Sequence, residues 1–514
     1  MTSFSILACL QAFRRTAQRS PRESARADQF EGWPNRHALV QPAAEWPAFV
    51  RDCQIARYYH TLLGPLAWAD FPERDRHASP SNPAVPYAPF LAASLVKLDQ
   101  HLVSMGQLRD YLVAHPALVW LLGFPLVVAP QTPLGFDPDA SLPTARHFTR
   151  LLRTIPDALP QFLLDSSVRV IRTELQPHGM SLGEVVAFDT KHILAWVKEN
   201  NPKAYLAERF NKAKQPAGDP DCKLGCKRRH NQSAQVDALP TTPRHNPQPP
   251  RGRTVGEFYW GYASGVVVVH LPGAVEVVLA ELTQPFDRPD VAYFVPLMQA
   301  TEQRLGHPPR FGTGDAAFDA FYVYEYFHAA GGFAAIPFAE RGGHRRQFSP
   351  DGLPLCQAGL AMPLRYTFQA RNAVGQHAMG RYACPLLFPE PTGQRCPIRH
   401  RQWPKGGCLT TMALSPGARL RYQLDRESEA FQQVYRQRTA TERINSQAVA
   451  LGIERQHLRN GAAIAHQNTL IYTLLNLRAL QRLRRLTPAD LGQAPAQASV
   501  SLTSRWVSLH FRPA

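Results

Sequence analysis

Two kinds of hydrophobic periodicity divide the chain. From Pro89 to Leu175, apolar residues recur at the spacing of helices, with breaks expected near Met105 and Pro116. From Gly183 onward, short apolar runs typical of strands alternate with helical stretches. The pattern therefore predicts a helical N-terminal part, followed by a part that contains a β-sheet.

The second part has the order strand, strand, strand, helix, strand, helix, strand, helix. The first three strands are expected at residues 183–193, 257–271 and 275–283, the last two joined by a hairpin at Pro272-Gly273. Further strands are expected at 311–315 and 333–340, and helices at 290–306, 317–332 and 431–452. This order predicts an α/β fold with a mixed sheet and flanking helices, in which the first and fourth strands can be neighbours.

Composition sets the expected domain boundaries. A basic, loosely ordered lead-in precedes a helical domain, for which DNA binding and packing or dimerisation are equal alternatives. The α/β domain carries a basic, proline-rich insertion and a second insertion that contains cysteines and arginines. These parts are assigned to residues 1–60 (lead-in), 61–180 (helical domain), 181–485 (α/β domain), 194–253 and 341–425 (insertions) and 486–514 (weakly ordered tail).

The helix expected from Phe431 to Gly452 combines apolar and charged residues on one face. Tyr435, Arg438 and Glu442 fall at i, i+3 and i+7, and therefore share that face. Phe431 and Val449 lie on the same face at its two ends. A buried ion pair between Arg438 and Glu442 is one explanation, and a functional site is the other.

Charge points to a polyanionic partner. Lys and Arg number 57 against 40 Asp and Glu, a formal net charge of +17, which favours nucleic acid. No apolar stretch is long enough to span a bilayer, because the best one, Ala117–Ala129, is short and contains Pro125. Eight cysteines in a chain of this length fit a reducing cytosol better than a disulfide scaffold, so a cytoplasmic protein is expected.

Three carboxylates stand at the ends of predicted elements. Asp189 is expected to end the first strand, Asp315 the fourth strand, and Glu442 lies on the helix described above. Converging carboxylates repel one another unless a cation such as Mg²⁺ or Mn²⁺ is bound, and two such ions serve phosphodiester chemistry. The alternative is that each Asp only caps a strand end. Asp319 is expected in the first turn of the following helix.

These residues carry a resemblance to a known family. The chain resembles bacterial insertion-sequence transposases of the DDE type, which have an RNase H-like catalytic domain. The matching stretches are VVAFDTKHILAWVKENNPKAY around Asp189, FGTGDAAFDAFYVYEYF around Asp315 and YRQRTATERINSQ around Glu442. The resemblance covers roughly Pro86 to Leu486.

The helix that carries the glutamate is the most specific part of this resemblance. The family signature is Tyr, two residues, Arg, three residues, Glu, six residues and Lys. Tyr435, Arg438 and Glu442 match it, whereas the Lys position is occupied by Val449. A phosphate-contacting role is therefore not expected at Val449.

The resemblance implies a function and a set of site residues. It implies cleavage of double-stranded DNA at transposon ends and strand transfer, with two Mg²⁺ or Mn²⁺ ions held by Asp189, Asp315 and Glu442. Two active sites that act on two ends suggest a homodimer on DNA. DNA-contacting residues are then expected at Tyr435, Arg438, Lys191, Arg345 and Arg346.

Four cysteines in the second insertion are candidates for a structural zinc site. Their spacing is long and irregular, without a Cys-x-x-Cys pair, so free thiols are the alternative. The candidates are Cys356, Cys384, Cys396 and Cys408.

Two other functions remain open beside a transposase. One is an RNase H-like nuclease that cuts DNA without joining it. The other is a non-catalytic, DNA-binding relic of a mobile element. Cleavage without joining would distinguish the first, and DNA binding without metal-dependent cutting would distinguish the second.

Overall fold

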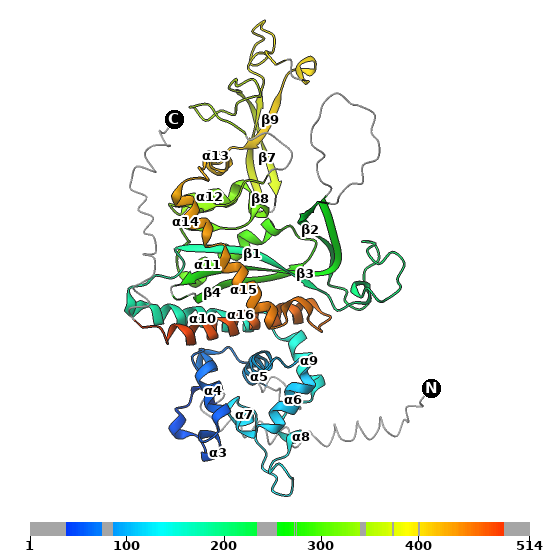
Figure 1. The fold of residues 1–514 in the computed structure, drawn as a ribbon, viewed down its shortest axis with the longest axis vertical. Helices are drawn as coiled ribbons and strands as arrows, with labels where there is room; N and C mark the ends of the chain where they lie inside the picture. Colours follow the sequence, from blue (N-terminus) through cyan, green and yellow to red (C-terminus); the bar gives the residue numbers. More distant parts are fainter. Residues whose placement is uncertain are drawn as a thin grey trace.

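The computed structural model describes residues 38–74, 86–233, 254–271, 273, 275–339, 346–372, 375–398 and 401–487. A helical domain lies at one end, an α/β body in the middle and a three-stranded sheet at the other end (Figure 1). Within the described ranges, no helix combines the length and the apolar character needed to cross a bilayer.

The helical domain follows the helical pattern of the sequence. Its helices are α3 (Ala48–Arg51), α4 (Gln54–Leu63), α5 (Tyr87–Asp99), α6 (Met105–Ala114), α7 (Pro116–Leu121), α8 (Pro138–Ser141), α9 (Ala145–Thr154) and α10 (Ala158–Leu175). The predicted break near Met105 is explained by a capping box, in which Ser104 and Gln107 satisfy each other's backbone N–H groups. Pro116 occupies the first turn of α7, where it needs no hydrogen-bonding N–H.

Helical structure begins earlier than the sequence suggested. Short 3-10 turns form at η1 (Ala38–Val40) and η2 (Ala43–Glu45), and α3 and most of α4 also fall before residue 61, with a further turn at η3 (Trp68–Asp70). The expectation of a loosely ordered lead-in over residues 1–60 is therefore corrected for residues 38–60. Residues 1–37 lie outside the described ranges.

The middle body contains a mixed, six-stranded sheet. Its strands are β1 (Val185–Leu194), β2 (Lys223–Ser233), β3 (Thr254–Leu271), β4 (Val275–Pro285), β5 (Phe311–Thr313) and β6 (Phe333–Ala335). β3 pairs antiparallel with β1, β2 and β4, and β1 pairs parallel with β5, which pairs parallel with β6. The predicted mixed α/β sheet is confirmed, as are the β3–β4 hairpin and the neighbouring first and fourth strands of the predicted order, β1 and β5.

Helices cover the two faces of this sheet. Alternate residues of β3 enter different cores, as the two-residue period of a strand requires. Val266 and Val268 pack with α15 (Thr439–Ala450) and α16 (Gly461–Leu483). Val267 and Val269 pack with α11 (Phe294–Leu305) and α12 (Phe321–Ala329). α14 (Glu429–Arg436) precedes α15, and α10 packs along α16.

The two predicted insertions contain more regular structure than expected. Residues 194–253 include β2, and residues 234–253 lie outside the described ranges. Residues 341–425, expected to be loops, form an antiparallel sheet of β7 (Leu364–Asn372), β8 (Gly375–Ala383) and β9 (Leu409–Ala413), followed by α13 (Pro416–Gln423). These strands escaped the sequence analysis because large apolar residues such as Tyr366 and Phe368 are exposed, so no buried run marks them.

Candidate active site

Asp189 and Asp315 occupy equivalent positions relative to the pairing of β1 with β5. The last pair of the parallel β1–β5 ladder is Ala187 with Thr313. Asp189 and Asp315 each follow this pair by two residues. The pleat of β1 puts Asp189 on the face of Ala187, and Asp315 lies just beyond the end of β5. The register thus brings the two residues to the same end of the β1–β5 pairing, close enough for the Asp315 carboxylate to act on Asp189.

The position of Asp189 corrects one expectation. Asp189 does not end its strand, because β1 continues to Leu194. The reason is that β3 still pairs with β1 after β5 has left, with Asp189 opposite Val266 and Leu194 opposite Gly261. Asp189 therefore ends only the pairing with β5, and it is held on its other side by a long antiparallel ladder.

The two carboxyl groups influence each other. Burial, helped by the carboxylates of Asp315 and Asp290, raises the pKa of Asp189 to about 7, and the Thr190 backbone N–H and Arg438 oppose this rise. Asp290, in the 3-10 turn η7 (Asp290–Tyr293), was missed by the sequence analysis. Burial and Asp315 also raise the pKa of Asp290, which accepts a hydrogen bond of 2.8 Å from the Thr190 hydroxyl. The site thus gathers negative charge in a poorly solvated place.

Asp315 and Asp319 have different surroundings. Asp315 caps the 3-10 turn η8 (Ala316–Phe318) by accepting the Ala317 N–H at 2.9 Å. Asp319 was expected in the first turn of the next helix, but α12 starts later, at Phe321. The Asp319 side chain is fully buried and is paired with Arg421, whose Nε lies 2.6 Å from Asp319 Oδ1. A buried ion pair therefore explains Asp319, which corrects the expectation of a helix-dipole role.

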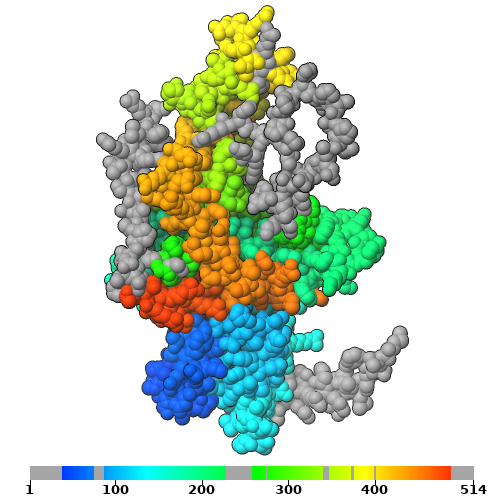
Figure 2. Space-filling model, in the orientation of Figure 1, coloured from blue at the N-terminus to red at the C-terminus, as the bar shows by residue number. Residues whose placement is uncertain are grey.

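The predicted helix from Phe431 to Gly452 is two helices, α14 and α15. Gln437 and Arg438 form a turn between them. Figure 2 shows this segment in orange along the visible face of the molecule. Phe431 is buried, but Val449 is 37% exposed, so the expected apolar residue at the far end of the face faces solvent instead. Gly452 has φ +86°, as expected of a glycine that ends a helix.

Tyr435, Arg438 and Glu442 form a connected group on this segment. The Tyr435 ring stacks on Phe431 with 5.8 Å between centroids, and the Arg438 guanidinium lies 5.9 Å from the Tyr435 ring. Arg438 Nη2 lies 2.6 Å from Glu442 Oε1. The ion pair considered above is present, but it is not buried, since the Glu442 side chain is 53% exposed.

Arg438 links this group to the strand carboxylates. Burial opposes the charge of its guanidinium, but the carboxylate of Glu442, Tyr435 and the carboxylate of Asp189 together raise its pKa. Arg438 therefore interacts with both Glu442 and Asp189.

Asn445 is a second residue that the sequence analysis missed. It lies one turn after Glu442 on α15, and its Nδ2 donates to Asp189 Oδ2 at 3.2 Å. Its Oδ1 is buried and has no hydrogen-bond partner among the described residues. An orphaned acceptor beside a carboxylate is unusual, because buried polar atoms are normally paired. Asn445 thus orients Asp189 and presents an unused oxygen next to it.

The carboxylates form a partial set of metal ligands. In the described part of the chain, no three His, Cys, Asp or Glu side chains are placed together so that they could hold a metal ion. Asp189 and Asp315 supply hard oxygen donors of the kind that Mg²⁺ prefers, and Asn445 Oδ1, which has no hydrogen-bond partner among the described residues, is a further oxygen beside them. Glu442 is engaged by Arg438 instead.

The remaining predicted DNA-contacting residues lie in several places. Lys191 is paired with Glu454 of the 3-10 turn η10 (Ile453–Arg455). Arg346 donates to Thr410 Oγ1 at 2.8 Å, beside the three-stranded sheet. Arg345 lies outside the described residues. Contact of these residues with DNA stays a prediction.

Three of the four candidate zinc ligands lie near one another. Cys384 and Cys408 flank the Ala383–Leu409 pair of the β8–β9 ladder. Burial raises the pKa of Cys408 to about 12, together with Cys384 and Cys356. Cys396 lies in the segment between β8 and β9. A zinc site at these four cysteines stays a prediction.

Comparison with models of known protein families found no match, and comparison with curated proteins found no significant similarity.

Proposed function

We propose that this chain is a DDE transposase that cleaves DNA at transposon ends and transfers the strands in a metal-dependent reaction. The observation that carries the proposal is the register of β1 and β5. It brings Asp189 and Asp315 to one place, next to the helix that bears Glu442. Asn445 ties that helix directly to Asp189.

The strand order supports an RNase H-like catalytic domain. Three successive antiparallel strands, β1, β3 and β4, are followed by two parallel strands, β5 and β6, with β1 between β3 and β5. This is the mixed sheet that the resemblance to DDE transposases implies. β2 is then an addition that extends β3 beyond this core.

The proposed metal site is based on the oxygen atoms that could act as ligands. Asp189 and Asp315 would hold a Mg²⁺ or Mn²⁺ ion, and Glu442 would join them by leaving its pair with Arg438. Two such ions, when bound, activate an attacking oxygen and stabilise a leaving oxygen in phosphodiester chemistry. The chain itself positions the ligands: Asn445 orients Asp189, and the capping bond from the Ala317 N–H orients Asp315.

DNA binding is supported by charge. The formal net charge of +17 favours a polyanion. Arg438 presents a guanidinium beside the carboxylates, where it can grip a phosphate bidentately, and Tyr435 packs against it. Their roles near the DNA backbone are those that the family resemblance implies.

The test is metal-dependent nicking of DNA that carries the sequences flanking the gene. The wild type should nick this DNA with Mg²⁺, and Asp189→Asn should not, because the amide is a poorer metal ligand. Asp110→Asn, at an exposed position of α6, is the matched control and should nick like the wild type. Joining of the nicked ends separates a transposase from a nuclease. Tight binding without nicking by any variant would favour the non-catalytic relic.

A further inference from the structure

Helix α9 has one buried face and one basic face. Phe148, Leu151 and Leu152 are buried in the core of the helical domain. Arg146, Arg150 and Arg153 are exposed and fall at i, i+4 and i+7, so they share one side of the helix.

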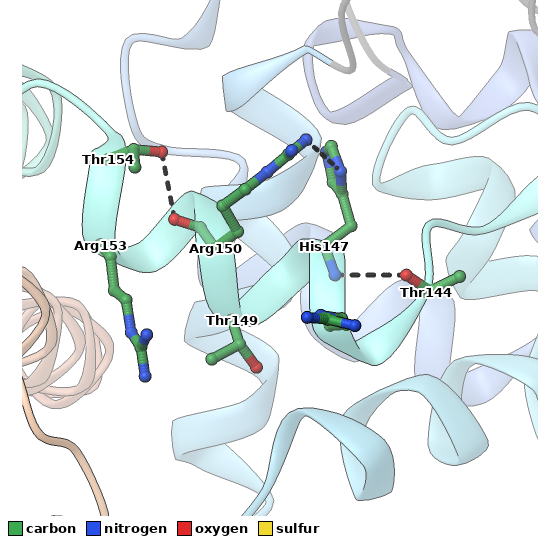
Figure 3. Close-up of a pocket in the computed structure, with 7 residues that line it drawn as sticks. Thr144, His147, Thr149, Arg150, Arg153 and Thr154 are labelled. Carbon is green, nitrogen blue, oxygen red and sulfur yellow. Dashed lines mark hydrogen bonds between the residues drawn. The ribbon is translucent and has the colours of Figure 1, made fainter. Parts of the chain in front are cut away.

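The arginines on this face are not neutralised. In the described part of the chain, neither Arg146 nor Arg153 has an acidic partner, whereas Arg109 pairs with Asp139 at 2.7 Å in the same domain. Arg150 Nη2 lies 2.9 Å from His147 Nδ1, and because a guanidinium can only donate, the histidine nitrogen accepts. In Figure 3 the Arg150 side chain reaches toward His147, while Arg153 extends away from both.

A surface hollow of about 590 Å³ runs along this side of the helix. Its lining contains threonine, arginine and histidine side chains and no carboxylate: Thr144, Arg146, His147, Thr149, Arg150, Arg153 and Thr154 (Figure 3). His147 Nε2 is buried and has no partner among the described residues. Since His147 Nδ1 accepts from Arg150, the Nε2 atom carries the proton and is an unused donor. Every charged or unpaired group here suits an anion.

α9 is fixed firmly to the α/β body. His466 of α16 is buried, and its two ring nitrogens lie 2.8 Å from the Leu152 carbonyl oxygen and 2.6 Å from Asp157 Oδ1. α16 follows α15, the helix that carries Glu442 and Asn445. In Figure 1, α9 lies below α16 on the side where α16 begins. The basic face is therefore connected through α16 to the body that carries the candidate active site.

We propose that the basic face of α9 binds the sugar–phosphate backbone of the DNA duplex that is held at the active site. This inference rests on the proposed function. From residue 146 to residue 153 the helix rises about 10 Å, at about 1.5 Å per residue. One strand of a duplex presents about three phosphates over that length, at one per about 3.4 Å of axis. Three guanidinium groups match such a row, because arginine binds phosphates bidentately.

Other partners fit this face less well. A single strand is normally bound by aromatic side chains on which bases stack, and no Phe, Tyr or Trp lines the hollow. A membrane-surface helix needs a free apolar face, but the apolar face of α9 is buried in the domain core. Duplex DNA is the polyanion that needs only what α9 offers.

The experiment measures how salt weakens DNA binding. Duplex binding by Asp189→Asn, which should not cut the probe, is followed by fluorescence anisotropy between about 50 and 200 mM salt, where released counterions dominate. Adding Arg146→Ala and Arg153→Ala should lower the slope of log K against log salt by about 2, at about 0.9 per lost phosphate contact. The matched control is Arg51→Ala with Arg57→Ala, two exposed arginines of the same domain that lie near Asp52. Its slope should equal that of Asp189→Asn.

Each outcome decides between the two proposals. A double variant on α9 with an unchanged slope overturns the α9 surface, even if the wild type nicks DNA. A reduced slope without nicking by the wild type supports DNA binding by the α9 surface and contradicts the catalytic proposal. Tighter binding of single-stranded DNA or of RNA than of duplex DNA overturns the choice of partner. If thermal unfolding shows that the alanine variant is destabilised, Arg146→Gln with Arg153→Gln replaces it and must show the same loss of slope.

Discussion

The arginines of α15 and its start differ from those of α9 in their partners. Arg438 lies 2.6 Å from Glu442, and Arg443 of α15 lies 2.5 Å from Glu276 on β4. In the described chain, Arg146 and Arg153 of α9 have no carboxylate beside them. Arginine therefore has two different roles in these two helices. The paired arginines fix the geometry of the protein, whereas the unpaired ones keep their charge available for a ligand.

Whether an arginine is paired with a carboxylate also determines which of the two surfaces can bind DNA first. A guanidinium that already holds a carboxylate must give up that partner before it binds a phosphate. Arg438 can therefore act on DNA only when Glu442 turns to another cation, as the proposed metal would require. The arginines of α9 face no such exchange, so they are suited to the first, salt-dependent encounter with DNA.

Removing the acidic partner of Arg438 should have the largest effect. Glu442→Gln should lower nicking by about a thousand-fold or more, because a bound metal stabilises the transition state by several kcal/mol and about 1.4 kcal/mol is tenfold. Binding of uncut duplex should not weaken, and should strengthen by about two- to fivefold, since the freed Arg438 comes to resemble the arginines of α9. Nicking and binding are measured on the same DNA.

Glu429→Gln is the control for this change. Glu429 is exposed in the first turn of α14, so its replacement alters charge equally without touching the site. Wild-type nicking by Glu442→Gln would remove Glu442 from the metal ligands. A parallel loss of nicking and binding would show that the Arg438–Glu442 pair holds the DNA itself.

The candidate site carboxylates were accessible to sequence reasoning because they depend on strand order and local spacing. Asp315 closely follows the short buried strand FGT, and Glu442 belongs to a spaced motif on a helix. Asn445 and Asp290 were not accessible, because each meets the site through a contact between distant segments. Asn445 bonds to Asp189 across 256 residues, and Asp290 meets Thr190 across 100 residues. No local pattern marks either one.

In the fold, too, elements marked by a local sequence pattern were predictable and the others were not. The β3–β4 hairpin was predictable from two apolar runs and a Pro-Gly turn. The three-stranded sheet β7–β9 was not, since β7 exposes Tyr366 and Phe368 and its pairing is carried by the backbone. The exposure of Val449 was hidden for a related reason: helical periodicity identifies a face but not which of its ends is covered.

Breaking the ion pair between Arg443 of α15 and Glu276 should lower the stability of the protein. Arg443→Ala leaves the Glu276 carboxylate, which is 2% exposed, with His270 as its remaining partner at 3.2 Å. We expect the free energy of unfolding to fall by about 2 kcal/mol, less than for a fully buried pair because Arg443 is itself partly exposed. Urea denaturation measures the change.

Two further variants sharpen this result. Glu276→Gln combined with Arg443→Ala should recover part of the loss, because the uncompensated buried charge is then gone. Arg153→Ala on α9 should change stability by less than about 0.5 kcal/mol, as expected of an exposed residue without a partner. Equal effects of Arg443→Ala and Arg153→Ala would erase the distinction between the two helices.

The smallest predicted effect concerns His147 of α9. Its pKa depends on whether a carboxylate lies near this helix. Burial, together with the charges of Arg150 and Arg74, lowers the pKa of His147 to about 4. The ordinary value is 6.5, so between pH 6.5 and pH 4 the unfolded chain binds a proton that the folded chain does not. The contribution of His147 to stability is therefore complete above pH 6.5 and falls as the pH is lowered toward 4.

The size of this contribution is about 1 kcal/mol, since the ring is only partly buried and solvent screens its charged neighbours. His147→Gln removes this titration. As the pH falls from 7 to 4.5, the free energy of unfolding of the wild type should therefore decrease relative to that of the variant. Urea denaturation at several pH values measures it, and shared titrations cancel in the difference. A nearby carboxylate would raise the pKa of His147 instead, and the wild type would then gain stability on acidification. That sign would break the contrast between α9 and α15, because it would place near α9 an acidic group of the kind that pairs with Arg438 and Arg443.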